Sequence, residues 1–290
     1  MRLSHATALA VTLALAVVTA TSSAAEASPH VPAVAKAPVT AADAPGGKAT
    51  PTKPRPVRDL WRPIASKATL PGGLAKANRP QPTPPPPPTD CRKAKCVALT
   101  FDDGPGPYSV GLARQLHARG AKATFYMVGR MVSEDPRAVK AIAAIPGMEI
   151  GAHTMTHPEL TKIAPSVAER EIGANTRALR ALVGPSVRTM RPPYGDRDAR
   201  TDQIAARHGL SVIMWDVDTL DWQSRSTPIT VSRAVKGARP GSIILMHDIH
   251  APTVKAAPRI ATELQRRGYT LVTVSELFGT TRPGRVYTNR

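Results

Sequence analysis

Val97–Pro105, with the sequence VALTFDDGP, is the stretch that decides the fold. It starts with the apolar run Val97–Leu99 and ends at a Gly-Pro pair, a pattern that predicts a buried strand followed by a loop. Asp102 and Asp103 then follow the carboxyl end of a strand, where ligands bind in α/β folds. One carboxylate at such a place can hold a metal ion while the other moves a proton. Taken alone, the pair is more typical of a solvated Asp-Asp-Gly turn, and it is the later stretches of the chain that favour a site.

Beyond this stretch, segments with a strand pattern and segments with a helix pattern alternate about seven times. Ser133 is the expected N-cap of one helix, and Ser166–Glu169 has the form of a capping box at the start of another. The expected strands are 123–128, 148–151, 187–190, 210–215, 242–246 and 269–272, and the expected helices are 109–119, 133–145, 166–183, 198–208, 229–236 and 253–267. This alternation predicts a mostly parallel sheet, either open or closed into a barrel, with helices packed against it.

Polar side chains follow several of the expected strand ends. In addition to the two aspartates they are His153, His157, Arg191, Asp221 and His247. Catalytic residues gather at this rim in barrel folds, so the sequence predicts one shared site. The HxxxH pair, on a helix or on a folded loop, can join one Asp oxygen in a three-ligand metal site with an open position. His247 is a candidate general acid, and the nearby His250 is given no role.

Together these stretches resemble the polysaccharide deacetylases, the family 4 carbohydrate esterases. The resemblance covers about residues 97–277 and rests on five motifs in the family's order. They are TFDDGP at 100–105, HTMTH at 153–157, RPPYG at 191–195, DW at 221–222 and LMH at 245–247. The fold that the resemblance implies is an α/β fold, a distorted and incompletely closed (β/α)7-type barrel.

The resemblance also implies roles for the first three motifs. Asp103, His153 and His157 would bind one divalent metal ion, usually Zn²⁺, which Co²⁺ can replace. Asp102 would be the general base that takes a proton from the attacking water, and Arg191 would pair with Asp102 and hold it in place. Metal binding brings the pKa of water down towards ~7, which is what hydrolysis of an acetamide at neutral pH needs.

The acid and the substrate pocket would come from the DW and LMH motifs and from the tyrosine of RPPYG. By resemblance, His247 is the general acid that protonates the leaving group, and Asp221 orients it. The backbone N–H of Tyr194 would stabilise the oxyanion, and Trp222 and Leu245 would line the pocket for the acetyl methyl group. An amine leaves poorly unless it is protonated, so amide hydrolysis depends on this acid.

The function that the resemblance implies is a metal-dependent hydrolase of amide bonds, a polysaccharide N-deacetylase. Its expected substrate is an acetylated polysaccharide, with N-acetylglucosamine units of peptidoglycan first and chitin-type glycans next. Two alternatives are an acetyl xylan esterase and a glycan-binding module that has lost its chemistry. Such a module should lack at least one of five residues, and none is missing: Asp102, Asp103, His153, His157 and His247.

The first part of the chain has a different composition from the rest. Residues 1–24 have the form of a secretory signal peptide, with one basic residue, an apolar core too short to span a membrane comfortably, and small residues for cleavage. Residues 25–89, rich in Pro, Ala and Lys, indicate a disordered linker, in which Leu60–Ile64 is a less polar piece. Residues 90–290 are then the catalytic domain. The expected location is outside the cell, with the cell wall as a further expectation and no membrane span after cleavage.

Charge and cysteine content fit a secreted protein. The net charge is +18, and the first 89 residues hold ten basic and three acidic side chains, which leaves about +11 for the domain. A basic secreted protein favours anionic cell-wall polymers as partners, and the signal segment argues against nucleic acid. Cys91 and Cys96 are predicted to form a short-loop disulfide, since exported proteins meet an oxidising environment.

Overall fold

The protein was analysed as a computed structural model that describes residues 89–290. The predicted signal peptide, residues 1–24, and nearly all of the predicted linker, with Leu60–Ile64, lie outside the described residues. None of the helices formed within residues 89–290 combines the length and the apolar character needed to cross a membrane.

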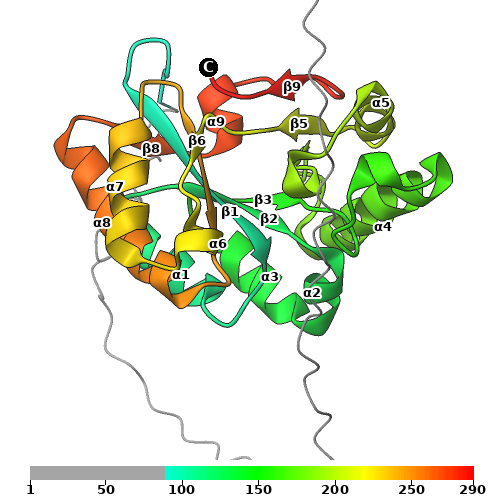
Figure 1. The fold of residues 1–290 in the computed structure, drawn as a ribbon, viewed down its shortest axis with the longest axis horizontal. Helices are drawn as coiled ribbons and strands as arrows, with labels where there is room; N and C mark the ends of the chain where they lie inside the picture. Colours follow the sequence, from blue (N-terminus) through cyan, green and yellow to red (C-terminus); the bar gives the residue numbers. More distant parts are fainter. Residues whose placement is uncertain (1–88) are drawn as a thin grey trace, which may run out of the picture. The chain divides into compact units, whose positions relative to one another are not determined.

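A nine-stranded sheet forms the centre of the described part of the chain (Figure 1). Its order is β6-β7-β1-β2-β3-β4-β5-β9, β8 pairs with β1, and every pair is parallel. The strands are β1 (Cys96–Gly104), β2 (Ala123–Met127), β3 (Met148–Ala152), β4 (Thr189–Met190), β5 (Ser211–Ile213), β6 (Val217–Asp218), β7 (Ile243–His247), β8 (Thr270–Val272) and β9 (Val286–Tyr287). The sheet curls into a half-barrel that stays open between β6 and β9, which confirms the expected incompletely closed barrel.

Helices surround the sheet, with α7 and α8 next to each other at one end of the view in Figure 1 and α4 and α5 at the other. The helices are α1 (Ser109–His117), α2 (Gly129–Glu134), α3 (Pro136–Ala143), α4 (Pro165–Val183), α5 (Ala199–Arg207), α6 (Asp221–Ser224), α7 (Thr227–Gly237), α8 (Ala251–Arg266) and α9 (Val274–Phe278). Most connections between consecutive strands run through this outer layer, whereas β5 and β6 are joined directly by residues 214–216.

Strand β1 lies in the middle of the sheet and carries the two-fold alternation of a strand buried on both faces. Val97, Leu99 and Phe101 belong to the main apolar core, under the helices. Ala98 belongs to a second apolar cluster on the opposite face. Asp102 is four residues further along that same face, so the alternation turns its side chain into the half-barrel.

The structure corrects two of the expected helices. The segment 133–145 is not one helix, because Asp135 accepts a hydrogen bond from the Ala138 N–H and starts α3, while Ser133 lies inside α2. Helix α4 begins at Pro165 with no side-chain cap, so the capping box at 166–169 does not form. Proline has no N–H to satisfy at a first helical position, which makes that start favourable.

The short elements β6, β9, α6 and α9 were not expected from the sequence. Each has two to five residues, too few to show a hydrophobic period. The predicted disulfide is confirmed, since Cys91 is bonded to Cys96 at the first residue of β1.

Candidate active site

The two aspartates at the end of β1 have different backbone conformations and different partners in one pocket. Asp102 keeps the strand conformation and lies in register with His247 of β7, and it is 3% exposed. Asp103 has a φ of 73°, in the left-handed region that few residues other than glycine adopt. That change of conformation ends the alternation and brings both carboxylates to the same pocket.

Arg191 is fully buried and holds Asp102. Its Nη1 donates to Asp102 Oδ1 and to Thr100 Oγ1, both at 2.8 Å. Its Nε and Nη2 donate to the carbonyl oxygens of Ile213 and Met214, each at 3.1 Å. A buried charge costs several kcal/mol unless it is paired and hydrogen-bonded, and here both conditions are met. The second oxygen of Asp102, Oδ2, makes no hydrogen bond within residues 89–290 and lies 3.8 Å from His153 Nε2 in the pocket.

Asp103, His153 and His157 converge on one point. Asp103 Oδ1 lies 3.4 Å from His153 Nε2 and 3.1 Å from His157 Nε2, and the three ligand atoms lie within 4.8 Å of one another. Burial raises the pKa of Asp103, but the two imidazoles beside it and the positive charge of His247 outweigh burial and hold that pKa below its usual range. The carboxylate is therefore ionised, as a metal ligand must be.

Two further observations fit this trio to a divalent ion. Asp103 Oδ1 is buried and has no hydrogen-bond partner among the described residues. His153 Nδ1 lies 2.7 Å from the carbonyl oxygen of Arg191, which can only accept, so Nδ1 carries the proton and the Nε2 lone pair is free. A ligating histidine is oriented in this way in most metal sites. Two imidazoles and one carboxylate are a set that suits zinc.

The HTMTH segment that carries both histidines is a loop rather than a helix. Helix α4 holds it through two residues one turn apart. Glu171 accepts hydrogen bonds from the backbone N–H groups of Met155 at 2.9 Å and Thr156 at 2.7 Å. Asn175 accepts from the His153 N–H at 3.0 Å. Sequence reasoning missed both, because an i, i+4 pair of polar residues does not say what its helix faces.

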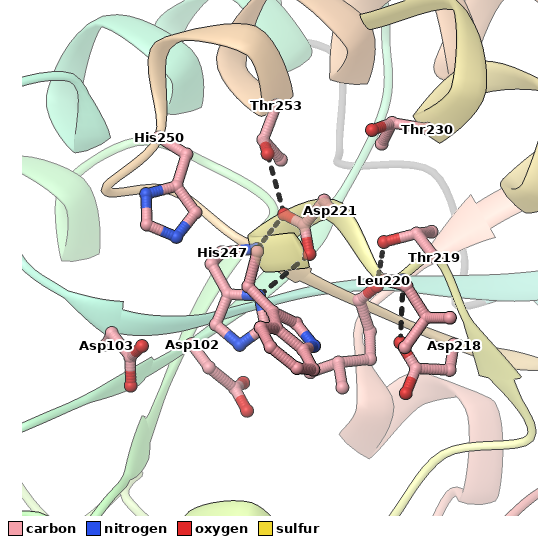
Figure 2. A network of polar contacts seen from close by, with 12 residues as sticks. Asp102, Asp103, Asp218, Thr219, Leu220, Asp221, Thr230, His247, His250 and Thr253 are labelled. Atoms are coloured by element: carbon pink, nitrogen blue, oxygen red, sulfur yellow. Dashed lines mark hydrogen bonds and ion pairs between the residues drawn. The ribbon is translucent and has the colours of Figure 1, made fainter. Parts of the chain in front are cut away.

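His247 is held from the other side of the pocket by Asp221, as Figure 2 shows. Its Nδ1 lies 2.8 Å from Asp221 Oδ1, and its backbone N–H donates to Asp221 Oδ2 at 2.8 Å. Thr253, which sequence reasoning missed, donates to the same Oδ2 at 2.6 Å. Asp221 is fully buried, and these bonds compensate for its lost hydration.

These contacts shift both pKa values. Burial lowers the pKa of His247, but its hydrogen bond to Asp221 and the negative charges of Asp221, Asp102 and Asp103 outweigh burial and raise it to about 9. Burial raises the pKa of Asp221, but the bond to His247 leads the opposing effects and the result is lowered. The pair is thus an imidazolium beside a carboxylate near neutral pH, with Nε2–H turned to the pocket.

The pocket has a volume of about 650 Å³ and gathers most of the predicted site. Eight of the ten predicted residues line it. The other two hold lining residues: Arg191 holds Asp102, and Asp221 holds His247. The eight are Asp102, Asp103, His153, His157, Tyr194, Trp222, Leu245 and His247. Tyr194 has a φ of 59° and its ring lies edge-on to His157, with ring centroids 4.6 Å apart. Five lining residues, apart from Pro192, had no role in the sequence analysis: Trp215, Asp218, Arg225, Ile249 and His250.

Comparison with known proteins agrees with this geometry. The family profile described as polysaccharide deacetylase matches residues 89–213. The chitooligosaccharide deacetylase of Bradyrhizobium sp. is 32% identical over 65% of this chain and 93% of its own. The chain belongs to the polysaccharide deacetylase family.

Other members of the family are similarly related. The peptidoglycan-N-acetylglucosamine deacetylase PgdA of Listeria monocytogenes is 39% identical over 64% of this chain, which spans about two fifths (39%) of that longer protein. The solved structure of a family 4 carbohydrate esterase from Streptomyces lividans, in complex with acetate, is 34% identical. It aligns with 65% of this chain and 97% of its own, with a TM-score of 0.60. The half-barrel is therefore the fold of this family.

Proposed function

We propose that this protein is a secreted, metal-dependent polysaccharide N-deacetylase. One observation carries the proposal: a ligand trio, a buried Asp-Arg pair and a His-Asp pair meet in one pocket. Each of the three has a separate task in amide hydrolysis, and a binding module would need none of them. The alternative of an inactive glycan-binding module has no such support.

The proposed metal site consists of Asp103, His153 and His157, with Zn²⁺ as the ion that this ligand set suits and Co²⁺ as a substitute. A bound divalent ion lowers the pKa of water and polarises a carbonyl group. The Nε2 atoms and Asp103 Oδ1 would hold the ion, and the carbonyl of Arg191 keeps His153 in the required tautomer.

The proton transfers are assigned to the other two pairs. Asp102 Oδ2 would accept the proton of the attacking water, because Arg191 occupies Oδ1 and fixes the carboxylate plane. His247 Nε2–H would donate a proton to the leaving nitrogen, and Asp221 would stabilise the imidazolium until that step. An acid with a pKa above neutral is protonated when the amide substrate arrives.

The acetyl group is proposed to be bound by Tyr194, Trp222 and Leu245. The backbone of Tyr194 turns at the pocket wall with a positive φ, and its N–H is the proposed oxyanion donor. Removing one such donor typically costs on the order of 10²–10³ in rate. Trp222 and Leu245 line the same pocket and offer apolar surface for the methyl group.

The proposed substrates are N-acetylglucosamine units, of peptidoglycan first and of chitin-type glycans second. The names of the Listeria and Bradyrhizobium relatives support this choice. A basic chain suits an anionic cell wall, where the signal peptide (1–24) and linker (25–89) would place the catalytic domain (90–290). Acetyl xylan is the alternative substrate, as an ester.

Acetate release tests the proposal. The protein should release acetate from peptidoglycan or chitooligosaccharides faster than from acetylated xylan, and a chelator should stop the reaction. A chain that starts at Asp90 should keep its rate on soluble oligosaccharides and bind insoluble wall material less tightly, because screened attraction of the basic segment is lost. If no acetylated glycan releases acetate while metal is bound, the enzymatic function is wrong.

A further inference from the structure

His250 lies beside the proposed acid and has no task in the proposed reaction. It immediately precedes α8, and its ring lies 5.9 Å from the ring of His247, tilted by 36° (Figure 2). Both rings line the same pocket. A second imidazole this close to a general acid could serve as another acid or as a hydrogen-bonding group, and its protonation decides which.

Arg225 settles the protonation of His250. Arg225 Nη1 lies 2.8 Å from His250 Nδ1. A guanidinium group has only donors, so Nδ1 must accept, and the proton of a neutral imidazole then sits on Nε2. Burial lowers the pKa of His250, and the positive charges of Arg225 and His247 lower it further. The ring is therefore neutral, with one tautomer and one N–H.

The backbone and a second hydrogen bond fix Arg225 itself. Its Nε donates to the carbonyl oxygen of Trp222 at 2.6 Å, just after α6. Its φ is 45°, the left-handed conformation with which many helices end, and here it ends α6. The guanidinium thus has a set position at the rim of the pocket, which a flexible surface arginine would not have.

The remaining nitrogen of His250 is left for a ligand. Within residues 89–290, the His250 ring makes its one hydrogen bond through Nδ1. We propose that His250 is a substrate-binding residue that presents its Nε2–H to an oxygen of the sugar that carries the acetamide. Arg225 is then a positioning residue that sets the tautomer. This inference rests on the proposed function, because it takes a glycan as the substrate.

A neutral donor also explains why two histidines can stand side by side. His247 gives up a proton in the reaction and needs the carboxylate of Asp221 for that. His250 keeps its proton and needs a cation at Nδ1, which is what Arg225 provides. Opposite partners at the two Nδ1 atoms therefore give the two rings opposite tasks, one to transfer a proton and the other to bind.

The tautomer can be measured directly. Long-range ¹H–¹⁵N NMR spectra of the unmodified protein should show His250 with a bare Nδ1 and a protonated Nε2. In Arg225→Ala the Nδ1–H form should appear as well, and Arg225→Lys should preserve the original tautomer in part. Arg266→Ala, which removes an exposed arginine of α8, is the matched control and should leave the His250 signals unchanged. A Nδ1–H tautomer or an imidazolium in the unmodified protein overturns the inference.

Binding tests the role. In an Asp102→Asn background, which should not consume the ligand, His250→Ala should raise the Kd for an N-acetylglucosamine oligomer about 3- to 10-fold, the value of one hydrogen bond. His250→Gln, which keeps an N–H donor, should recover most of the loss. In the active enzyme, His250→Ala should raise KM for the oligomer more than it lowers kcat. An aryl acetate lacks the sugar, so its hydrolysis should not depend on the His250 donor.

The outcomes separate this inference from the proposed function. If acetate is released and His250→Ala binds the oligomer as tightly as the unmodified protein, His250 is not a substrate-binding residue, although the enzyme stands. If no glycan is deacetylated or bound, the proposed function fails, whatever the tautomer. A loss in kcat alone, on amide and ester alike, would also overturn the binding role.

Discussion

Asp103, His153 and His157 form one half of the pocket, called here the ligand half, and His247 with Asp221 forms the acid half. The ligand half depends on backbone conformation. Asp103 and His157 have φ values of 73° and 67°, and backbone amides of the His153–His157 loop are held by helix α4. In the acid half, His247 ends the regular strand β7, and Asp221, the first residue of α6, holds it through side-chain hydrogen bonds.

The difference has a chemical reason. A metal site needs three atoms at fixed positions, so the chain accepts strained backbone to bring them together. A general acid needs a suitable pKa, so its partner must supply charge rather than position. Substitutions in the ligand half should therefore change metal affinity. Substitutions in the acid half should change proton affinity and leave the metal in place.

The largest effect is expected from removing a ligand. His157→Ala should lose bound metal and all detectable deacetylation, as chelation does, and added Zn²⁺ or Co²⁺ should restore the chelated enzyme. Asp102→Asn is the comparison, because it should keep the metal and lose 10²–10⁴-fold in rate, the usual value of a general base. Metal content and acetate release are measured on the same samples. If Asp102→Asn releases the ion and Asp103→Asn does not, the two aspartates have exchanged roles.

The next effect separates the acid half by the leaving group. His247→Ala should slow de-N-acetylation of an N-acetylglucosamine oligomer by about 10²–10⁴-fold, because an amine must be protonated to leave. Hydrolysis of an aryl acetate should fall much less, since a phenolate leaves unaided. Metal content should stay at its original level. Equal losses on both substrates would place His247 in water activation or metal binding, and His250 would be the first acid to test in its place.

A smaller effect is expected from the support of the ligand half. Glu171→Gln keeps the size of the side chain and replaces an acceptor that serves the Met155 and Thr156 amides. Metal affinity should fall about tenfold, the lower end of the usual cost of disturbing a ligand's support. Glu263→Gln, the same change on the surface of α8, should leave the affinity unchanged. Unaltered affinity in Glu171→Gln would mean that the carboxylate of Glu171 is not needed to hold the loop.

The sequence predicts the residues that react better than it predicts the residues that hold them in place. The residues at strand ends follow from the local pattern, because a buried run such as Val97–Leu99 and its Gly-Pro stop need no knowledge of the rest of the fold. The residues that hold them in place do not follow from the local pattern. Glu171 and Thr253 reach the site from helices whose own patterns show only an amphipathic face.

The same limit applies to the roles. Nothing local distinguishes Asp102 from Asp103 as base and ligand, and here a single positive φ turns their carboxylates to different partners. The pairing of Arg225 with His250 joins segments 25 residues apart and has no counterpart in the family motifs that the sequence shows. Contacts of this kind depend on the packing of α6 and α8 against the sheet.

The smallest effect, a shift in pH dependence, tests the acid half most directly. His247 must carry its proton to act, and its pKa is raised to about 9 by Asp221 and its neighbours. De-N-acetylation should therefore persist through neutral pH and fall as the pH rises through the pKa of His247. Asp221→Asn removes the charge that favours the imidazolium, so this fall should move to lower pH by about one to three units.

Aryl acetate hydrolysis provides the internal control, because it does not use the proton of His247 and its alkaline profile should be the same in both proteins. A bound divalent ion adds positive charge near His247 and lowers its pKa in the unmodified protein and the variant alike. The difference between the two proteins is therefore the quantity to measure, from profiles of kcat/KM against pH. An unchanged amide profile in Asp221→Asn would show that Asp221 orients His247 without setting its proton affinity, and the two halves of the pocket would then both work by position.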